Sequence, residues 1–245
     1  MQPEIETLEA NAINRVPCKV WFFISLYAMI IVLGNWFDLR VISFFGLVAN
    51  AGTLIFAFTF FLANIITEVY GYKFARLAIW WGFFFNLFIF IYGQLVILIP
   101  CPENTYNQMF DTLLQANNRA ILAGLVSYFS SEPLNSLVMA KLKIELKGRY
   151  TGARFLIATI IGSTVDSVLF GLIAFYGVFE IKLLVSMIFG MTIIKVAIDF
   201  ATLPFFLHLT QKLKQKEKLD IYDKGTRFNM FSFDTSYPAV ANHFK

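Results

Sequence analysis

Six long apolar runs constrain this sequence more strongly than any other feature. They cover residues 20–37, 41–69, 77–99, 120–140, 155–176 and 183–209. A helix needs about 20 apolar residues to cross the roughly 30 Å of hydrocarbon in a bilayer. Hydrophobic residues make up 58% of the 245-residue chain, more than a soluble domain of this size could bury. We therefore predict an all-α integral membrane protein, built as a six-transmembrane-helix bundle.

The basic residues predict how this bundle faces the membrane. When the connecting segments alternate between the two faces, one face receives 16 Lys and Arg residues, the other receives 3, and Lys195 remains inside a span. Positive charge is retained in the cytoplasm, so both termini are expected to be cytoplasmic. The chain then divides into a cytoplasmic segment (1–19), a membrane domain (20–209) and a basic cytoplasmic tail (210–245). The last part of the tail is expected to be disordered because it is polar and turn-rich.

Two further segments bear on where a site could form. Asn50 and Gly52 interrupt the second run early. One interpretation is a short outer piece followed by a break, which is typical of a binding region; the other is a single long tilted helix. Residues 100–118 form the longest external loop that the sequence predicts, and this loop could cap an outward cavity or only connect two spans.

Residues 191–209 are apolar enough to span a bilayer, yet they carry Lys195 near the middle and Asp199 one helical turn later. A charge at the centre of a spanning helix costs roughly 2.5–3.5 kcal/mol on insertion scales, so it rarely lies there without a partner or a task. Because the two residues are four positions apart, they could pair on one helix face. The alternative is that they face charged groups on neighbouring spans.

Three ionisable residues are predicted to share one depth in the membrane. Glu132, Asp166 and Lys195 each follow a basic residue near the start of their span by 12 or 13 positions. At 1.5 Å per residue, each lies about 18–20 Å from that end of its helix. Converging charges of this kind favour an interior polar cavity for a small solute. The candidate binding residues of this level are Glu132, Asn135, Ser163, Asp166, Lys195 and Asp199.

A second motif, NIITEVYGYKFAR over residues 64–76, joins the second and third spans on the predicted cytoplasmic side. Asn64 and Glu68 lie one helical turn apart, and Gly71 permits the tight reversal that follows. The two polar side chains could line the inner mouth of the cavity. The competing interpretation is a helix end whose polar groups are satisfied locally.

Several functional classes lack the motifs that they require. The sequence has no GxGD, no HExxH and no GxSG nucleophile with a histidine partner, so we do not expect an enzyme, although Glu132 and Asp166 could still act as an acid pair. Cys18 and Cys101 form no CxxC, and no metal or cofactor site is predicted. The basic residues lie in short segments rather than on one face, which argues against a nucleic-acid partner. A channel or transporter for another small polar solute stays open.

The same stretches resemble the queuosine precursor transporter family, also called the vitamin uptake transporter family. The similarity lies in NIITEVYGYKFAR, in RFLIATIIGSTVDSVLFGLIAFYG of the fifth span, in IIKVAIDFATLP of the sixth, and in EKLDIYD after it. The resemblance implies a multi-pass protein of the bacterial inner membrane that imports deazaguanine precursors such as queuine. It places the family's acidic position on Glu68, its fifth-span aspartate on Asp166 and its sixth-span lysine on Lys195.

The fourth span departs from the family pattern. Glu132 and Asn135 stand where a glutamine and an aspartate are expected, and Ser163 stands where a glutamine is common. We expect Glu132 or Asp166 to bind the guanine-like edge of the solute, since a carboxylate can accept two hydrogen bonds from it. Phe170 or Phe129 would stack on the base. Membrane lipids are the other expected partner, while the preferred precursor, the energy source and a homo-oligomeric state stay open.

Overall fold

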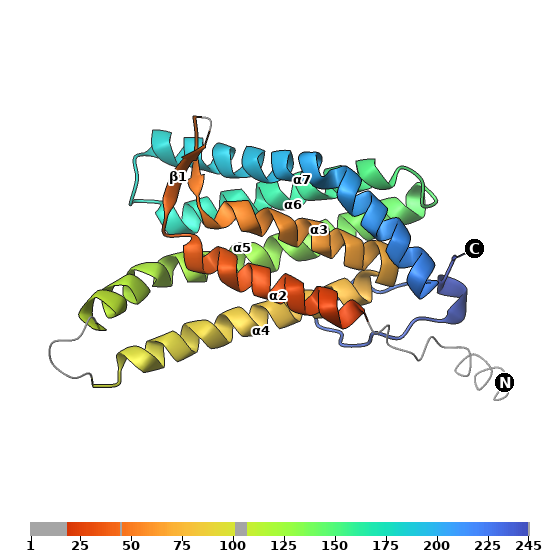
Figure 1. Cartoon of the computed structure of the whole chain (residues 1–245), viewed down its shortest axis with the longest axis horizontal. Coiled ribbons are helices and arrows are strands. Elements are labelled where there is room, and N and C mark those ends of the chain that lie inside the picture. Colours follow the sequence, from red (N-terminus) through yellow and green to blue (C-terminus); the bar gives the residue numbers. More distant parts are fainter. Residues whose placement is uncertain (1–18, 45, 101–106, 245) are drawn as a thin grey trace.

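The computed structural model describes residues 19–44, 46–100 and 107–244, and it shows a bundle of long helices that run side by side (Figure 1). The segment predicted over residues 1–19 lies almost wholly outside these described residues, as do Cys18 and Cys101. The long helices are α2 (Val20–Phe37), α3 (Gly52–Tyr70), α4 (Tyr72–Ile97), α5 (Asn107–Glu145), α6 (Thr151–Phe175) and α7 (Ile181–Glu217).

Helix α3 lies at the centre of the bundle. It contacts α2, α4, α5, α6 and α7, and nearly all of its residues from Phe56 to Tyr70 are buried. Five helices are long and apolar enough to span a bilayer, namely α2, α3, α4, α6 and α7. Helix α5 is the longest but carries more polar residues along its length. The crossing by α5, which corresponds to the predicted span 120–140, therefore stays a prediction.

The outer surface of the bundle is apolar. Phe88 on α4 and Phe189, Phe200 and Phe205 on α7 each expose more than 60% of their surface. A soluble protein rarely leaves so many large aromatic side chains in water. In a bilayer the same side chains are solvated by lipid tails, and the backbone polar groups behind them are satisfied within the helices. The exterior thus agrees with a multi-pass membrane protein.

The break at Asn50 is present, and the alternative of one long tilted helix over 41–69 is wrong. Strands β1 (Val41–Phe44) and β2 (Leu47–Asn50) form an antiparallel hairpin, with Val41 opposite Asn50. β-Branched residues favour the extended form here, and α3 begins only at Gly52. Strand β2 packs on α7, where a side chain at Gly190 would collide with the Val48 carbonyl. We call this the hairpin end of the bundle (Figure 1).

The predicted loop over residues 100–118 is shorter than expected. Helix α5 already begins at Asn107 and continues for 39 residues to Glu145, with Pro133 inside it. The polar composition of residues 107–118 suggested a loop, but these residues are good enough helix formers to extend the span by about three turns. Residues 101–106 lie outside the described part of the chain.

The tail is packed through residue 244, which corrects the expectation that its last part is disordered. Helix α7 continues to Glu217, and the chain then folds back, so that the Ile221 N–H donates to the Val69 carbonyl at 3.3 Å. Gly71, with φ +87°, lets the α3–α4 turn approach the tail closely, and any Cβ there would collide with Tyr237. Hydrogen bonds between the tail and the bundle therefore hold in place a segment whose composition alone suggests disorder. We call this the tail end of the bundle, opposite the hairpin end (Figure 1).

Candidate functional site

A narrow polar cavity lies inside the bundle on the hairpin side of its centre. Residues from α2, β2, α3, α5, α6 and α7 surround it: Asn35, Asp38, Asn50, Thr53, Phe56, Gly124, Ser127, Asp166, Phe170, Met191 and Lys195. It has room for about one water molecule. The described conformation is therefore closed around this site.

Asp166 and Lys195 form an ion pair at the floor of the cavity. Lys195 Nζ lies 2.5 Å from Asp166 Oδ2, and both residues are only 3% exposed. Lys195 also donates to Ser167 at 3.2 Å, and its ammonium sits 5.2 Å from the centre of the Phe56 ring. The pair joins α6 to α7, and Ser131 on α5 donates to the other oxygen of Asp166 at 3.3 Å. Three helices thus meet at this point, with Ser131 rather than Glu132 as the contact from α5.

The hairpin side of the cavity contains residues that sequence reasoning missed. Asp38 ends α2 and accepts a hydrogen bond from Asn50 of β2, which in turn accepts one from Thr53. Asn35 is buried nearby and bonds to Asn86 of α4 at 2.8 Å. The break at Asn50 was the available signal for this group. No sequence signal pointed to Asp38, because it directly follows an apolar run and resembles the water-exposed end of a helix.

Glu132 lies deeper in the bundle, toward the tail end. Its Oε1 accepts a hydrogen bond from Thr59 of α3 at 2.6 Å, while Oε2 has no hydrogen-bond partner among the described residues. The Tyr27 hydroxyl of α2 lies beside it without forming a well-aligned bond. Glu132 is close enough to Asp166 and Lys195 to interact with both electrostatically. It extends the polar region from the cavity toward the tail end.

Asn64 and Asn135 continue this polar region by one more helical turn. Asn135 Nδ2 donates to Asn64 Oδ1 at 3.2 Å, and Asn64 Nδ2 donates to the Thr159 hydroxyl of α6 at 3.2 Å. Ser163, one turn before Asp166 along α6, is fully buried and donates only to the Ile160 carbonyl of its own helix. Asn64 therefore faces the interior polar region rather than pairing with Glu68.

Asp199 does not pair with Lys195, which corrects one of the two interpretations of the sixth span. Lys195 is engaged by Asp166 on the neighbouring helix instead. Asp199 is fully buried beside the Thr159 hydroxyl, but no hydrogen bond of normal geometry reaches either of its oxygens from the residues described. The ion pair of Lys195 therefore joins two helices, α6 and α7, and not two residues of one helix.

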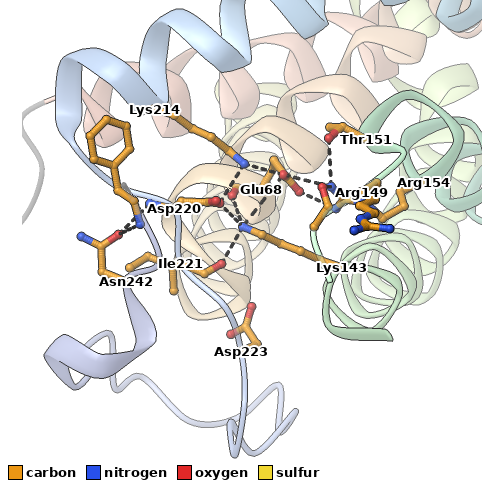
Figure 2. Close-up of polar contacts among 12 residues, drawn as sticks. Glu68, Lys143, Arg149, Thr151, Arg154, Lys214, Asp220, Ile221, Asp223 and Asn242 are labelled. Atoms are coloured by element: carbon orange, nitrogen blue, oxygen red, sulfur yellow. Dashed lines mark hydrogen bonds and ion pairs between the residues drawn. The ribbon is translucent and has the colours of Figure 1, made fainter. Parts of the chain in front are cut away.

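Glu68 is fully buried and belongs to a separate cluster of charged residues at the tail end (Figure 2). Arg154 of α6 holds its carboxylate in a bidentate arrangement, with nitrogen–oxygen distances of 2.6 and 3.1 Å. Lys214 of α7 binds the same carboxylate at 2.6 Å. Such paired contacts are strong and geometrically selective. Glu68 thus ties α3 to α6 and α7 and does not line the cavity near Asp166.

Lys143 and Asp220 complete this tail-end cluster (Figure 2). Lys143, at the end of α5, donates to the Glu68 carbonyl at 2.5 Å and to the Ile221 carbonyl at 2.7 Å. Asp220 of the tail lies 2.7 Å from both Lys143 and Lys214. The tail-end cluster therefore contains three bases, Lys143, Arg154 and Lys214, and two acids, Glu68 and Asp220, and every one of them has a partner.

The two aromatic candidates lie in different places. Phe170 lines the cavity next to Asp166, where it could contact a planar solute. Phe129 packs against Trp80 and Phe83 instead, with ring centres 5.2 and 5.1 Å apart. Phe56, which sequence reasoning missed, takes the second aromatic position at the cavity.

These contacts define a polar region in the interior of the bundle, rich in carboxyl, amide and hydroxyl groups. Asp38, Asp166, Glu132 and Asp199 lie along the polar region, and Lys195 is the base that pairs with one of them. The described residues contain no group of three His, Cys, Asp or Glu side chains that could hold a metal ion. Buried carboxyl and amide groups without a full set of partners can instead bind a solute rich in hydrogen-bond donors.

A bundle of apolar helices around such a polar interior is typical of membrane transporters. Residues 50–209 match the family model described as "Putative vitamin uptake transporter". The chain belongs to this family, whose description is that of transporters. The chain is also 25% identical over 176 residues to the "Probable queuosine precursor transporter" of Bacillus subtilis (strain 168), covering 71% of this chain and 77% of that relative. No solved structure matches.

Proposed function

We propose that this protein imports queuosine precursors, queuine or related 7-deazaguanines, across the bacterial inner membrane. The observation that carries the proposal is the Asp166–Lys195 pair, which closes one side of a cavity lined by amides and hydroxyls inside the transporter fold. The name of the Bacillus subtilis relative supports the substrate class. The bias in basic residues supports a cytoplasmic location for both termini and for the tail end.

The cavity offers the groups that a deazaguanine requires. The Asp166 carboxylate can accept two hydrogen bonds from the ring N–H and the exocyclic amine, once Lys195 gives up its place. Asn50 and Asn35 offer amide groups toward the hairpin end, and Phe170 offers a ring face for stacking. Glu132 and Asn135 lie farther toward the tail end, where the solute would pass next.

Transport also requires the bundle to open, because the cavity is closed in the described conformation. The tail-end cluster holds α3, α5, α6 and α7 together through Glu68 and Lys143. A cavity on one side and a saturated ion-pair cluster on the other fit a carrier that is shut toward the cytoplasm in this conformation. Release of the solute into the cytoplasm would then require these four helices to separate.

Uptake of labelled queuine tests the proposal directly. Cells that cannot synthesise the precursor are supplied with queuine, and queuosine in their tRNA is measured with and without this protein. We expect the wild type to restore the modification and Asp166→Ala and Glu132→Ala to lose it, at confirmed membrane expression. Glu180→Gln, which changes an exposed carboxylate at the start of α7, is the matched control and should behave as the wild type.

Unchanged modification in both alanine variants would remove Asp166 and Glu132 from the site. If the wild type failed to restore queuosine while reaching the membrane, the substrate assignment would be wrong. Direct uptake of labelled guanine, hypoxanthine or another polar solute would then identify the class of solute that the cavity accepts.

A further inference from the structure

Asp199 is the acid of the bundle interior that lacks any partner. It is fully buried on α7, and neither carboxyl oxygen accepts a hydrogen bond within residues 19–44, 46–100 and 107–244. The other interior acids differ, since Asp166 is bound by Lys195 and Glu132 by Thr59. A carboxylate with no partner is strongly disfavoured in a membrane interior. Such a buried acid is more stable with a proton than as a carboxylate.

Few charged groups surround Asp199, and one of them is a base within reach. Lys195 precedes it by one turn on the same helix, a spacing at which side chains can meet. Glu132 on α5 is close enough to interact electrostatically, as is Lys195, and Asp166 on α6 lies beyond Lys195. The nearest polar group of α3 is the neutral Asn64, which donates to the Thr159 hydroxyl beside Asp199. The polar group of β2 is the neutral Asn50, farther toward the hairpin end.

We propose that Asp199 is a second position for the Lys195 ammonium, occupied when the substrate takes Asp166. This proposal rests on the proposed function. Hydrogen-bond donors of the substrate bind the Asp166 carboxylate and displace the Lys195 ammonium. This ammonium then moves to the Asp199 carboxyl group, which lies one helical turn farther along α7. The O–H bond of Asp199 breaks, its oxygen keeps the electron pair, and the proton passes to water. Asp199 is thus a positioning residue that holds Lys195 away from the occupied site.

This exchange links substrate binding to the release of one proton. When binding releases one proton, the affinity rises by up to about tenfold for each unit of pH over the range where Asp199 is protonated in the free protein and ionised in the complex. An asparagine at position 199 has the shape of the protonated acid, so the fold should be kept. It cannot become a carboxylate, so Lys195 would have no second position.

The experiment measures the affinity of labelled queuine for the purified full chain in nanodiscs between about pH 5 and pH 8. We compare wild type, Asp199→Asn, Asp199→Glu and the control Glu180→Gln. The ratio of wild-type to Asp199→Asn affinity should be near one at the acid end and grow by up to about tenfold per pH unit. Taking this ratio removes the ionisation of queuine itself, which is the same for both proteins.

Proton release gives a second measurement on the same samples. In weakly buffered solution, binding should release about one proton per queuine from the wild type and from Glu180→Gln, and none from Asp199→Asn. Asp199→Glu keeps a carboxyl group and should retain the release. Equal pH slopes in wild type and Asp199→Asn would overturn the proposal, as would proton release from Asp199→Asn. No queuine binding by the wild type at any pH would instead refute the proposed function.

Discussion

Charged groups find partners to different extents in two parts of the bundle. One is the mid-membrane polar region, which runs from the cavity at Asp166 past Glu132 to Asn135, and the other is the tail-end cluster. In the tail-end cluster, three bases and two acids share contacts so completely that each has a partner (Figure 2). In the mid-membrane region, Lys195 is bound to Asp166, while among the residues that the structure describes Asp199 has no hydrogen-bond partner and Glu132 uses one oxygen of two. A saturated cluster has nothing left to offer a ligand. Unsatisfied acids that persist in a membrane interior indicate a site that binds something.

This difference also separates stability from function. Breaking a buried ion pair by removing one partner leaves an uncompensated charge. At the tail end we therefore expect substitutions to act on folding and on helix association. In the mid-membrane region we expect neutral replacements that leave no carboxylate without its partner to preserve the fold and abolish transport. The predictions below are ordered by the size of the expected effect.

The largest effect is expected for Glu68→Gln. Arg154 would then lose its carboxylate partner, and Lys143 and Lys214 would be left with Asp220 alone. We expect the free energy of unfolding to fall by about 3–5 kcal/mol. The measurement is thermal unfolding in detergent, with Glu145→Gln as the control, since Glu145 is exposed in the last turn of α5 and should change stability by less than about 0.5 kcal/mol. Normal stability combined with lost transport would place Glu68 in the transport path and remove the contrast between the two regions.

The second prediction concerns the Asp166–Lys195 pair and compares single with double replacements. Asp166→Asn should lower queuine uptake by about tenfold to a hundredfold, because a charge-assisted hydrogen bond contributes about 1.5–3 kcal/mol. Lys195→Met leaves Asp166 buried without its partner and should destabilise the protein.

The double variant Asp166→Asn, Lys195→Met removes both charges. It should recover stability to within about 1 kcal/mol of the wild type, since neutral replacement of a buried pair is often tolerated, without recovering uptake. Uptake by the double variant at the wild-type rate would show that the pair serves only the fold.

The sequence predicted the helices of the bundle well and the segments between them poorly. In lipid, a long apolar segment satisfies its backbone hydrogen bonds by forming a helix. The helices α2, α3, α4, α6 and α7 therefore follow from composition alone. The hairpin at Val41–Asn50, the early start of α5 at Asn107 and the docked tail depend on tertiary contacts. For example, the Ile221 N–H donates to the Val69 carbonyl, and the composition of the tail does not predict that contact.

The candidate site shows the same division. Helical rise predicted one level for Glu132, Asp166 and Lys195; Asp166 and Lys195 do meet, while Glu132 lies farther toward the tail end. Which neighbour each side chain meets depends on helix rotation, which the sequence does not give directly. Lys195 therefore bonds to Asp166 rather than Asp199, and Glu68 belongs to the tail-end cluster rather than to the cavity. Asp38 was missed because a single acid after an apolar run looks like an ordinary helix end.

A third, smaller effect tests whether the saturated network continues into the tail through neutral groups. The Tyr237 hydroxyl accepts from the Lys73 N–H at 2.9 Å and donates to Asp223 at 2.6 Å. Tyr237→Phe should lower the free energy of unfolding by about 1–2 kcal/mol, since it leaves a donor and an acceptor unpaired. Thermal unfolding is the measurement, and Tyr150→Phe, whose side chain is exposed, is the control. An equal effect of both changes would show that the tail adds nothing to the tail-end network.

The smallest effect is expected where an ion pair of the tail is exposed to water. Hydrogen bonds from Lys73 and from Ser236 lower the pKa of Asp234 from 3.8 to about 2. A carboxyl group whose pKa is lowered by folding stabilises the folded state above its unfolded pKa, and this contribution disappears as the pH falls toward the folded value. Docking of the tail should therefore weaken between about pH 4 and pH 2.

The matching measurement compares wild type with Asp234→Asn by limited proteolysis of the tail across this pH range. Above about pH 4 the wild type should be more resistant, by no more than a few tenths of a kcal/mol, because about half of the Asp234 side chain is exposed and water screens the pair. Near pH 2 the two proteins should be cleaved alike. A difference that persisted at pH 2, or that matched the effect of Glu68→Gln, would mean that exposed and buried pairs contribute alike, against the contrast drawn above.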